Sequence, residues 1–139
     1  MGKTRRVSSL SRSPSGPGRG ILPGTLDMLV LRAVAVTPMH GWAIAHWILR
    51  ESTFELHIDD GSLYPALRRL ERSSLILVRW GRSEQNRRAK YYRISAPGKR
   101  ALRSMLSDWR AFSAAISTTL ARSALAAARR SRRRYGRGA

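Results

Sequence analysis

The residues from Asp59 to Ser73 constrain the fold of this chain more than any other stretch does. Asp59 and Asp60 can cap a helix by accepting hydrogen bonds from backbone N–H groups of its first turn, and their charge suits the positive end of the helix dipole. Pro65 fits an early turn, where its missing N–H costs little. The stretch therefore predicts a helix over residues 60–73.

At the helical period this segment separates into two chemically different faces. The apolar face, which predicts contact with a core, consists of Leu63, Ala66, Leu67 and Leu70. The opposite face carries small, hydroxyl and guanidinium groups from Gly61, Ser62, Pro65, Arg68, Arg69 and Arg72, with Tyr64 at the margin. Arginine on such a face can pair with guanine edges or phosphates in a DNA major groove. A basic face that meets only water is the alternative interpretation of this stretch taken alone.

The charge of the chain favours a polyanionic partner. Lysine and arginine number 27 against eight acids, which gives a formal net charge of +19. Residues 1–20 hold five basic residues and residues 121–139 hold seven, both without an acid, and residues 21–120 are still basic. Counterion release and long-range steering draw such a chain toward polyanions. Charge by itself does not choose among DNA, RNA and anionic lipid.

The two ends of the chain differ in composition from its middle. Residues 1–20 are rich in Ser, Arg, Gly and Pro and predict a disordered basic arm. Residues 121–139 predict an arginine-rich basic tail that is helical at most near its start. No apolar run approaches the length of a membrane span, so no membrane contact is expected.

The sequence predicts neither an enzyme nor a metal or cofactor site. Cysteine is absent, which removes a thiol nucleophile and cysteine ligands. His40, His46 and His57 lack the spacing of metal ligands, and no Ser/His/Asp set can be assembled. Helix capping is the preferred interpretation of Asp59 and Asp60, ahead of a catalytic pair.

The first half of the middle region alternates between helical and strand patterns. A helix capped by Thr25 is predicted to run to about Thr37, followed by a turn over residues 38–41. A second helix is expected over residues 41–51, and residues 54–58 alternate as a short strand candidate. The tryptophans outside the last helix are expected in the core or at its rim: Trp42, Trp47 and Trp80.

A basic hairpin is predicted after the 60–73 helix. Residues 75–80 and 89–94 are rich in β-branched and aromatic residues and read as strands. Residues 81–88 join them as a hairpin tip with one acid and three arginines: Arg82, Arg87 and Arg88. Tyr91 and Tyr92 alternate faces, so one of them should pack on the core.

A last helix is predicted from a cap at Ser95 through residues 96–120. Its apolar residues repeat at heptad-like spacing: Leu102, Met105, Trp109, Phe112 and Ile116. Such a stripe suits packing against a partner helix and predicts dimerisation. Packing onto its own domain fits the periodicity equally well.

These elements together predict a mainly α protein with a small antiparallel β-sheet, a winged helix-turn-helix over residues 21–95. In that fold the third helix enters the major groove and the hairpin, the wing, touches backbone or minor groove. Both carry the arginine excess here, which favours binding of double-stranded DNA. The candidate contacts are Ser62, Tyr64, Pro65, Arg68, Arg69, Arg72, Arg82, Arg87, Arg88 and Lys90.

The chain also resembles the PadR family of bacterial transcriptional regulators over about residues 21–120. The residues that carry the resemblance are Gly24–Leu31, Pro38–Gly41, Gly61–Leu67 and Ala89–Ile94. The resemblance implies a cytoplasmic, nucleoid-associated homodimer, usually a repressor, in the subtype with a short C-terminal dimerisation helix. It also implies that a planar aromatic effector could bind beside Trp109, although interface packing is the simpler role.

The arginine-rich ends depart from the family's usual pattern. Such arms add affinity for nucleic acid that does not depend on base sequence. They keep a second hypothesis open, a nonspecific or architectural nucleic-acid-binding protein driven by residues 1–20 and 121–139.

Overall fold

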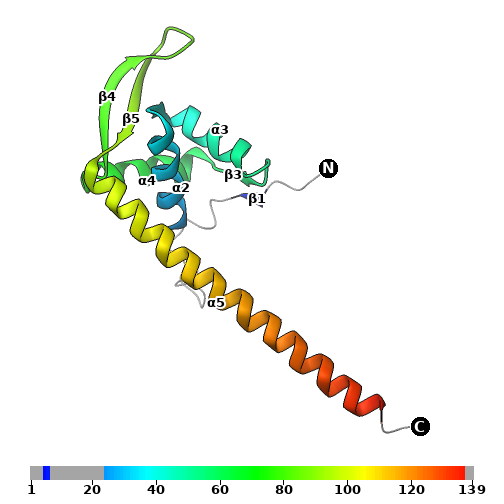
Figure 1. The fold of residues 1–139 in the computed structure, drawn as a ribbon. Helices are drawn as coiled ribbons and strands as arrows, with labels where there is room; N and C mark the ends of the chain where they lie inside the picture. Colours follow the sequence, from blue (N-terminus) through cyan, green and yellow to red (C-terminus); the bar gives the residue numbers. More distant parts are fainter. Residues whose placement is uncertain (1–4, 7–23, 137–139) are drawn as a thin grey trace. The chain divides into compact units, whose positions relative to one another are not determined.

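The chain folds into helices and short strands that follow one another in sequence. A computed structural model describes residues 5–6 and 24–136, which divide into two compact units between Met105 and Leu106. The elements in order are β1 (Arg5–Arg6), α2 (Thr25–Val36), β2 (Met39–His40), α3 (Gly41–Glu51), β3 (Leu56–His57), α4 (Asp60–Arg72), β4 (Ile76–Arg82), β5 (Arg88–Ile94) and α5 (Ala96–Tyr135). This arrangement confirms the predicted fold class, a mainly α winged helix with a small antiparallel sheet (Figure 1).

The core of the first unit lies among α2, α3 and α4. The buried apolar side chains of these helices are Leu26, Met28, Val30, Leu31, Ala33, Val34, Ile44, Ile48, Leu63, Ala66, Leu67 and Leu70. Each large side chain among them contributes on the order of 1.5–3 kcal/mol through removal from water. The predicted apolar face of the third helix is therefore confirmed in full. Tyr92 of β5 is 5% exposed, which confirms that one of the paired tyrosines packs on the core.

The wing is a regular two-stranded hairpin. β4 and β5 pair antiparallel from Ile76 opposite Ile94 to Arg82 opposite Arg88, and Figure 1 shows their loop extending beyond the helices. Ser83 donates its backbone N–H to the Arg87 carbonyl at 2.8 Å, so the loop is shorter than the predicted tip over residues 81–88. Asn86 takes a left-handed conformation, φ 57°, which suits a tight loop because asparagine tolerates it.

Three local predictions are corrected by backbone conformation. Gly24, with φ 75°, is the N-cap of α2, so Thr25 is the first helical residue and not the cap. The expected turn over residues 38–41 contains β2, whose Met39 and His40 pair with β5. The strand expected over residues 54–58 shrinks to β3, because Thr53 and Phe54 are left-handed, φ 53° and 62°, and cannot extend it.

The N-terminal arm lies outside the described residues except for β1. Arg5 and Arg6 run parallel to Leu56 and His57 of β3. The sequence does not predict this strand, because nothing in a basic, Ser-rich segment marks two residues for pairing.

Helix α4 starts as its sequence predicts. Asp59 is the N-cap, and its Oδ1 accepts a hydrogen bond from the Ser62 N–H at 2.9 Å. Pro65 is the sixth residue of the helix and lies in its second turn, an early turn as predicted. Proline has no N–H to donate to the Gly61 carbonyl, so one helical hydrogen bond is missing. The helix tolerates this loss because it lies close to the helix start.

A buried serine joins the wing to the last helix. The Ser95 hydroxyl accepts the Gly98 N–H at 3.0 Å, as the predicted cap, and donates to the Ser74 carbonyl at 2.6 Å. The Ser95 N–H also bonds the Leu75 carbonyl at 3.1 Å. Gly98 packs so tightly that a Cβ there would collide with the Leu75 carbonyl oxygen.

Helix α5 is longer than predicted. It runs for 40 residues to Tyr135, whereas the sequence predicts its end near Leu120 and a basic tail after it. Residues 121–128 are mostly alanine and the next six mostly arginine, and both are strong helix formers, so nothing stops the helix there. Every residue from 114 to 136 is exposed.

Candidate nucleic-acid interface

A groove in the first unit brings the recognition helix and the wing to one concave surface. Its volume is about 930 Å³. One wall comes from the start of α3, a second from α4 through Tyr64 and Arg68, and a third from the wing over residues 83–90. The groove therefore joins the two elements that carry the arginine excess in the sequence.

On the α4 wall, Tyr64 is held against the first turn of α3. A Cβ on Gly41 would lie 3.3 Å from the Tyr64 hydroxyl oxygen, so the glycine leaves room for the ring. Tyr64 remains 45% exposed and lines the groove. Arg68 follows one turn later and is exposed.

The α3 wall is an aromatic and basic ridge that sequence reasoning did not assign to the site. Trp42 is 63% exposed and stacks on His46 with ring centroids 3.7 Å apart. Arg50 continues the same side of the helix. The spacing of four residues from Trp42 to His46 to Arg50 was the available signal, because Ile44 and Ile48 of this helix face the core.

His40 fixes the start of that ridge. Its Nδ1 accepts the Ala43 N–H at 3.2 Å and so caps α3. Its ring also meets the edge of Tyr91, with centroids 5.4 Å apart. The histidine therefore contacts both α3 and the sheet, and its ring centroid lies 6.2 Å from that of Trp42.

On the wing, Arg88 is positioned by an aromatic ring. Its guanidinium carbon lies 4.4 Å from the ring centroid of Trp80, a cation–π contact that orders the long side chain. Trp80 is 54% exposed, so it lies at the rim and not in the core. Lys90 also lines the groove but pairs with Glu71 at 3.2 Å, which engages part of its charge.

The groove is positively charged with few internal counter-charges. Its ionisable lysines, arginines and acids are Arg50, Arg68, Arg88, Lys90 and Glu84. The two ion pairs among the described residues are Arg69–Asp27 and Lys90–Glu71. Neither uses Arg68 or Arg88, so those guanidinium groups are available to an incoming anion.

The remaining predicted contacts lie outside this groove. Ser62, which the sequence predicts on the polar face, is instead buried at 8% exposed and lies on the packed side of α4. Arg69 bonds Asp27 of α2 at 3.0 Å, and Arg82 donates to the Asn86 carbonyl at 3.2 Å. The others that do not line the groove are Pro65, Arg72 and Arg87.

The floor of the groove carries a tyrosine that stays protonated. Burial raises the pKa of the Tyr92 hydroxyl, and the charges of Glu71 and Tyr64 raise this pKa further, against a smaller opposite effect from Arg68. The Lys90 ammonium lies 5.8 Å from the Tyr92 ring centroid. Tyr92 therefore acts as a neutral support beneath the basic walls.

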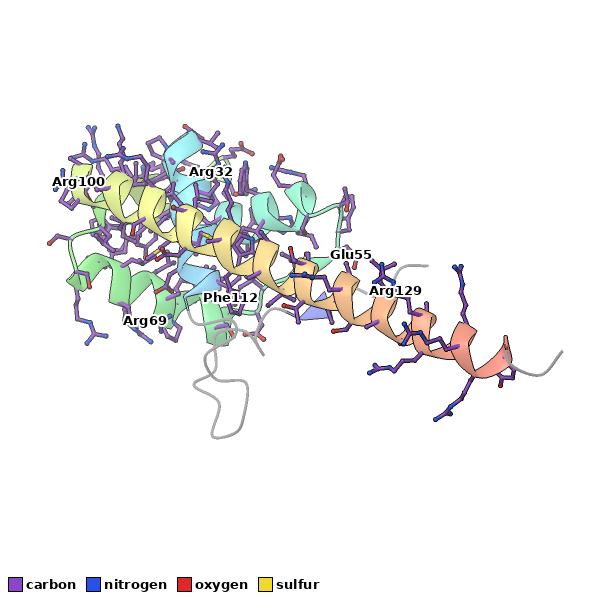
Figure 2. The ribbon with its side chains drawn as sticks, turned by 60° about the horizontal axis from the view of Figure 1, so that its bottom comes forward. Arg32, Glu55, Arg69, Arg100, Phe112 and Arg129 are labelled. Atoms are coloured by element: carbon purple, nitrogen blue, oxygen red, sulfur yellow. The ribbon has the colours of Figure 1, made fainter. Side chains whose placement is uncertain are left out.

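The apolar stripe of α5 is partly available to a partner. Leu102 is 6% exposed and packs within its own chain, and Met105 is half-buried. Trp109, Phe112 and Ile116 are 37%, 38% and 38% exposed, and the rings of Trp109 and Phe112 lie 6.5 Å apart. Figure 2 labels Phe112 on this helix.

A metal-binding cluster and a membrane-spanning helix are both absent from the described part of the chain. No group of three His, Cys, Asp or Glu side chains there could hold a metal ion. None of its helices combines the length and apolar character needed to cross a membrane.

A family model and one curated relative match this chain. The model of the transcriptional regulator PadR-like family matches residues 30–104. An uncharacterized protein of Lysinibacillus sphaericus is 29% identical over 89 residues, which are 64% of this chain and 82% of that protein.

Solved structures of this family share the fold. A PadR family transcriptional regulator from Eggerthella lenta DSM 2243 is 32% identical, with a TM-score of 0.60 over 70% of this chain and 82% of that one. A PadR family transcription regulator from Clostridium difficile R20291 is 27% identical, with a TM-score of 0.61 over 70% of this chain and 99% of that one. With a family match over more than half of its length, the chain belongs to the PadR-like family of transcriptional regulators, which are DNA-binding winged-helix proteins and not enzymes.

Proposed function

We propose that this chain is a repressor that binds a palindromic operator as a homodimer, with α4 in the major groove and the β4–β5 hairpin as wing. The observation that carries the proposal is the basic groove, whose walls include both Arg68 of α4 and Arg88 of the wing. A duplex that enters this groove would meet the two elements together. Repression follows if the operator overlaps a promoter, because the bound dimer would exclude the polymerase.

The groove residues divide into base-reading and phosphate-binding roles. Arg68 is the base-reading candidate, because it is exposed on α4 without an ion-pair partner among the described residues, and a guanidinium can bind guanine O6 and N7 together. Arg88, ordered by Trp80, and the Tyr64 hydroxyl suit phosphate oxygens, which position the protein without reading sequence.

Trp42 and His46 add a flat, exposed surface beside these arginines. The indole N–H can donate to a phosphate oxygen, and the ring can cover deoxyribose carbons. We assign Trp42 to the DNA contact as a sequence-independent anchor. Arg50, in line with them on α3, extends the same phosphate-binding ridge.

The homodimer would form through Trp109, Phe112 and Ile116 of α5, with Met105 at the edge of the seam. The side chains recur at heptad-like spacing. Trp109, Phe112 and Ile116 remain more than one-third exposed in one chain, which suits burial by a second copy. Two recognition helices related by a two-fold axis should bind half-sites about 34 Å apart, one turn of DNA.

A small planar aromatic molecule is the effector class that this seam suits. The exposed Trp109 ring beside Phe112 offers a stacking surface. Titration with a panel of planar aromatic compounds should quench tryptophan emission, and a Trp109→Phe variant should lose that quenching. No quenching by any compound would remove the effector from this proposal.

The operator proposal is tested by mapping chromosomal occupancy in the bacterial cytoplasm, followed by footprinting of the occupied sites. We expect an inverted repeat protected on two adjacent turns, a protein stoichiometry of two per site, and higher transcription of the neighbouring gene when the protein is deleted. Protection without any common sequence would instead support the nonspecific nucleic-acid-binding hypothesis.

A further inference from the structure

The last turns of α5 form a basic surface that the winged helix does not use. Between Trp109 and Gly136 the chain contains no acid. The end of the helix carries a dense group of cations: Arg129, Arg130, Arg132, Arg133 and Arg134. We call these five residues the arginine segment. All of them are exposed, and Figure 2 shows Arg129 and its neighbours pointing away from the helix in several directions.

The arginine segment cannot extend the dimer seam. Continuing the heptad positions of Trp109 and Ile116 along α5 gives Ser123 and then Arg130, and the positions of Met105 and Phe112 lead to Thr119, Ala126 and Arg133. Along these positions, large apolar residues are therefore replaced first by small residues and then by arginine. A seam of this kind would bring positive charges of two copies together, and Asp108 is the single acid on the whole helix.

The arginine segment also lacks the apolar face that a protein partner would need. At 100° per residue its five side chains spread over roughly 200° of the helix circumference. A helix about 10–12 Å across fits the major groove of DNA, about 12 Å wide, with phosphates on both sides. Guanidinium groups spread over such a wide arc can reach both phosphate rows.

We propose that the arginine segment is a second DNA-binding element, which binds phosphates of double-stranded DNA independently of base sequence. This proposal goes beyond the operator contacts of the winged helix, because the arginine segment would supply affinity for any duplex. A helix is well suited to this role, since the charges are held in place before binding and less conformational entropy is lost than from a disordered tail.

The test uses the full-length protein and a 30-base-pair duplex of random sequence, so that it does not depend on finding an operator. In one variant all five arginines of the segment become glutamine, which is close to arginine in helix propensity. Fluorescence anisotropy then measures affinity against salt concentration, and circular dichroism checks the helix content.

Each phosphate contact contributes about 0.9 to the slope of log affinity against log salt. We expect the five-glutamine variant to bind the random duplex at least roughly tenfold more weakly, with a slope shallower by about 3–4. A variant with five lysines keeps the charge and should keep most of the slope. An unchanged slope in the glutamine variant would overturn the proposal.

A matched control separates a binding site from bulk charge. Lys99, Arg100 and Arg103 are exposed basic residues in the first turns of the same helix. Their conversion to glutamine should lower affinity much less per charge removed than loss of the arginine segment does. Equal losses per charge would overturn the proposal in favour of net charge alone.

A membrane surface is the competing polyanion. Vesicles containing phosphatidylserine are titrated with the wild-type and five-glutamine proteins under the same conditions. A loss confined to vesicles, with random-duplex binding intact, would reassign the segment to lipid and overturn the proposal. A loss on the duplex that is larger per charge than in the control variant upholds the proposal, whether or not the occupancy map reveals an operator. The proposal therefore stands or falls separately from the proposed repressor.

Discussion

Two neighbouring arginines on α4 have different partners. Arg69 bonds Asp27 at 3.0 Å, whereas Arg68 lines the groove and has no ion-pair partner among the described residues. Helical periodicity places both on the polar side, because adjacent residues differ by only 100°. What separates them is the approach of Asp27 on another helix, and that depends on tertiary packing.

Replacing Arg68 with alanine should relax specificity at one base position. A bidentate contact with guanine is worth about 1–3 kcal/mol of discrimination, so selection from a degenerate operator library should show one position losing its preference. The matched Arg69→Ala variant removes an exposed ion pair worth at most about 1 kcal/mol and should leave the selected sequence unchanged. Identical base preferences in wild type and Arg68→Ala would contradict the base-reading role.

A second prediction concerns stability, at the closely packed position of Gly98. Gly98→Ala would push a methyl group into the Leu75 carbonyl oxygen, so urea unfolding should show a loss of about 1–3 kcal/mol or more. Gly61→Ala, at an exposed site in α4 whose nearest contact is ordinary, should be neutral or stabilise by up to about 1 kcal/mol. Equal stability of the two variants would mean that Gly98 is not closely packed against the Leu75 carbonyl oxygen.

At the scale of elements, the wing and α5 are predicted to act by different physics. The wing contributes charge held in place by an aromatic ring, since Arg88 lies over Trp80. The α5 stripe contributes exposed apolar area, which the second chain of the proposed dimer would cover.

Replacing Arg88 with alanine should weaken binding to all duplexes alike. Removal of one guanidinium–phosphate interaction should make the salt slope shallower by about 1, with base preferences intact. Trp80→Leu, which removes the cation–π contact but keeps the charge, should give a smaller loss, while Arg87→Ala, outside the groove, should change little. An Arg88→Ala variant that changes the selected sequence would assign this residue to base reading instead.

A charge placed in the α5 stripe should separate the dimer. Ile116→Lys would bury an unpaired ammonium in an apolar seam, which is strongly unfavourable, so sedimentation velocity should report a monomer at micromolar concentration. Ala114→Lys, on the opposite side of the same turn, serves as the control and should remain dimeric. If Ile116→Lys sediments as a dimer, the interface lies elsewhere.

Element types are more predictable from sequence than the composition of the site. The stripe of Leu63, Ala66, Leu67 and Leu70 fixes both the helix and its buried face, and the cap at Asp59 fixes its start. The end of α5 differs from its prediction because a run of arginines is typical of a solvated tail, although arginine also favours helix. Which arginines share a groove, and that Trp42 joins them, depends on how α3 packs beside α4 and the wing.

At the scale of the whole molecule, the central claim is that α4 and the wing face one duplex. The chain has no cysteine, so a single introduced cysteine can carry an iron chelate that cuts nearby DNA. Tyr64→Cys places the chelate on α4 and Gln85→Cys places it on the wing, both at the groove. Glu55→Cys is the control, because Glu55 (labelled in Figure 2) is exposed and is not among the residues that line the groove.

Cleavage of operator DNA by these three tethered proteins is the most direct measurement. We expect the chelates at positions 64 and 85 to cut the same duplex within about one helical turn of each other, and the chelate at position 55 to cut weakly or not at all. Strong cutting from position 55, with none from positions 64 and 85, would contradict the shared DNA-facing groove.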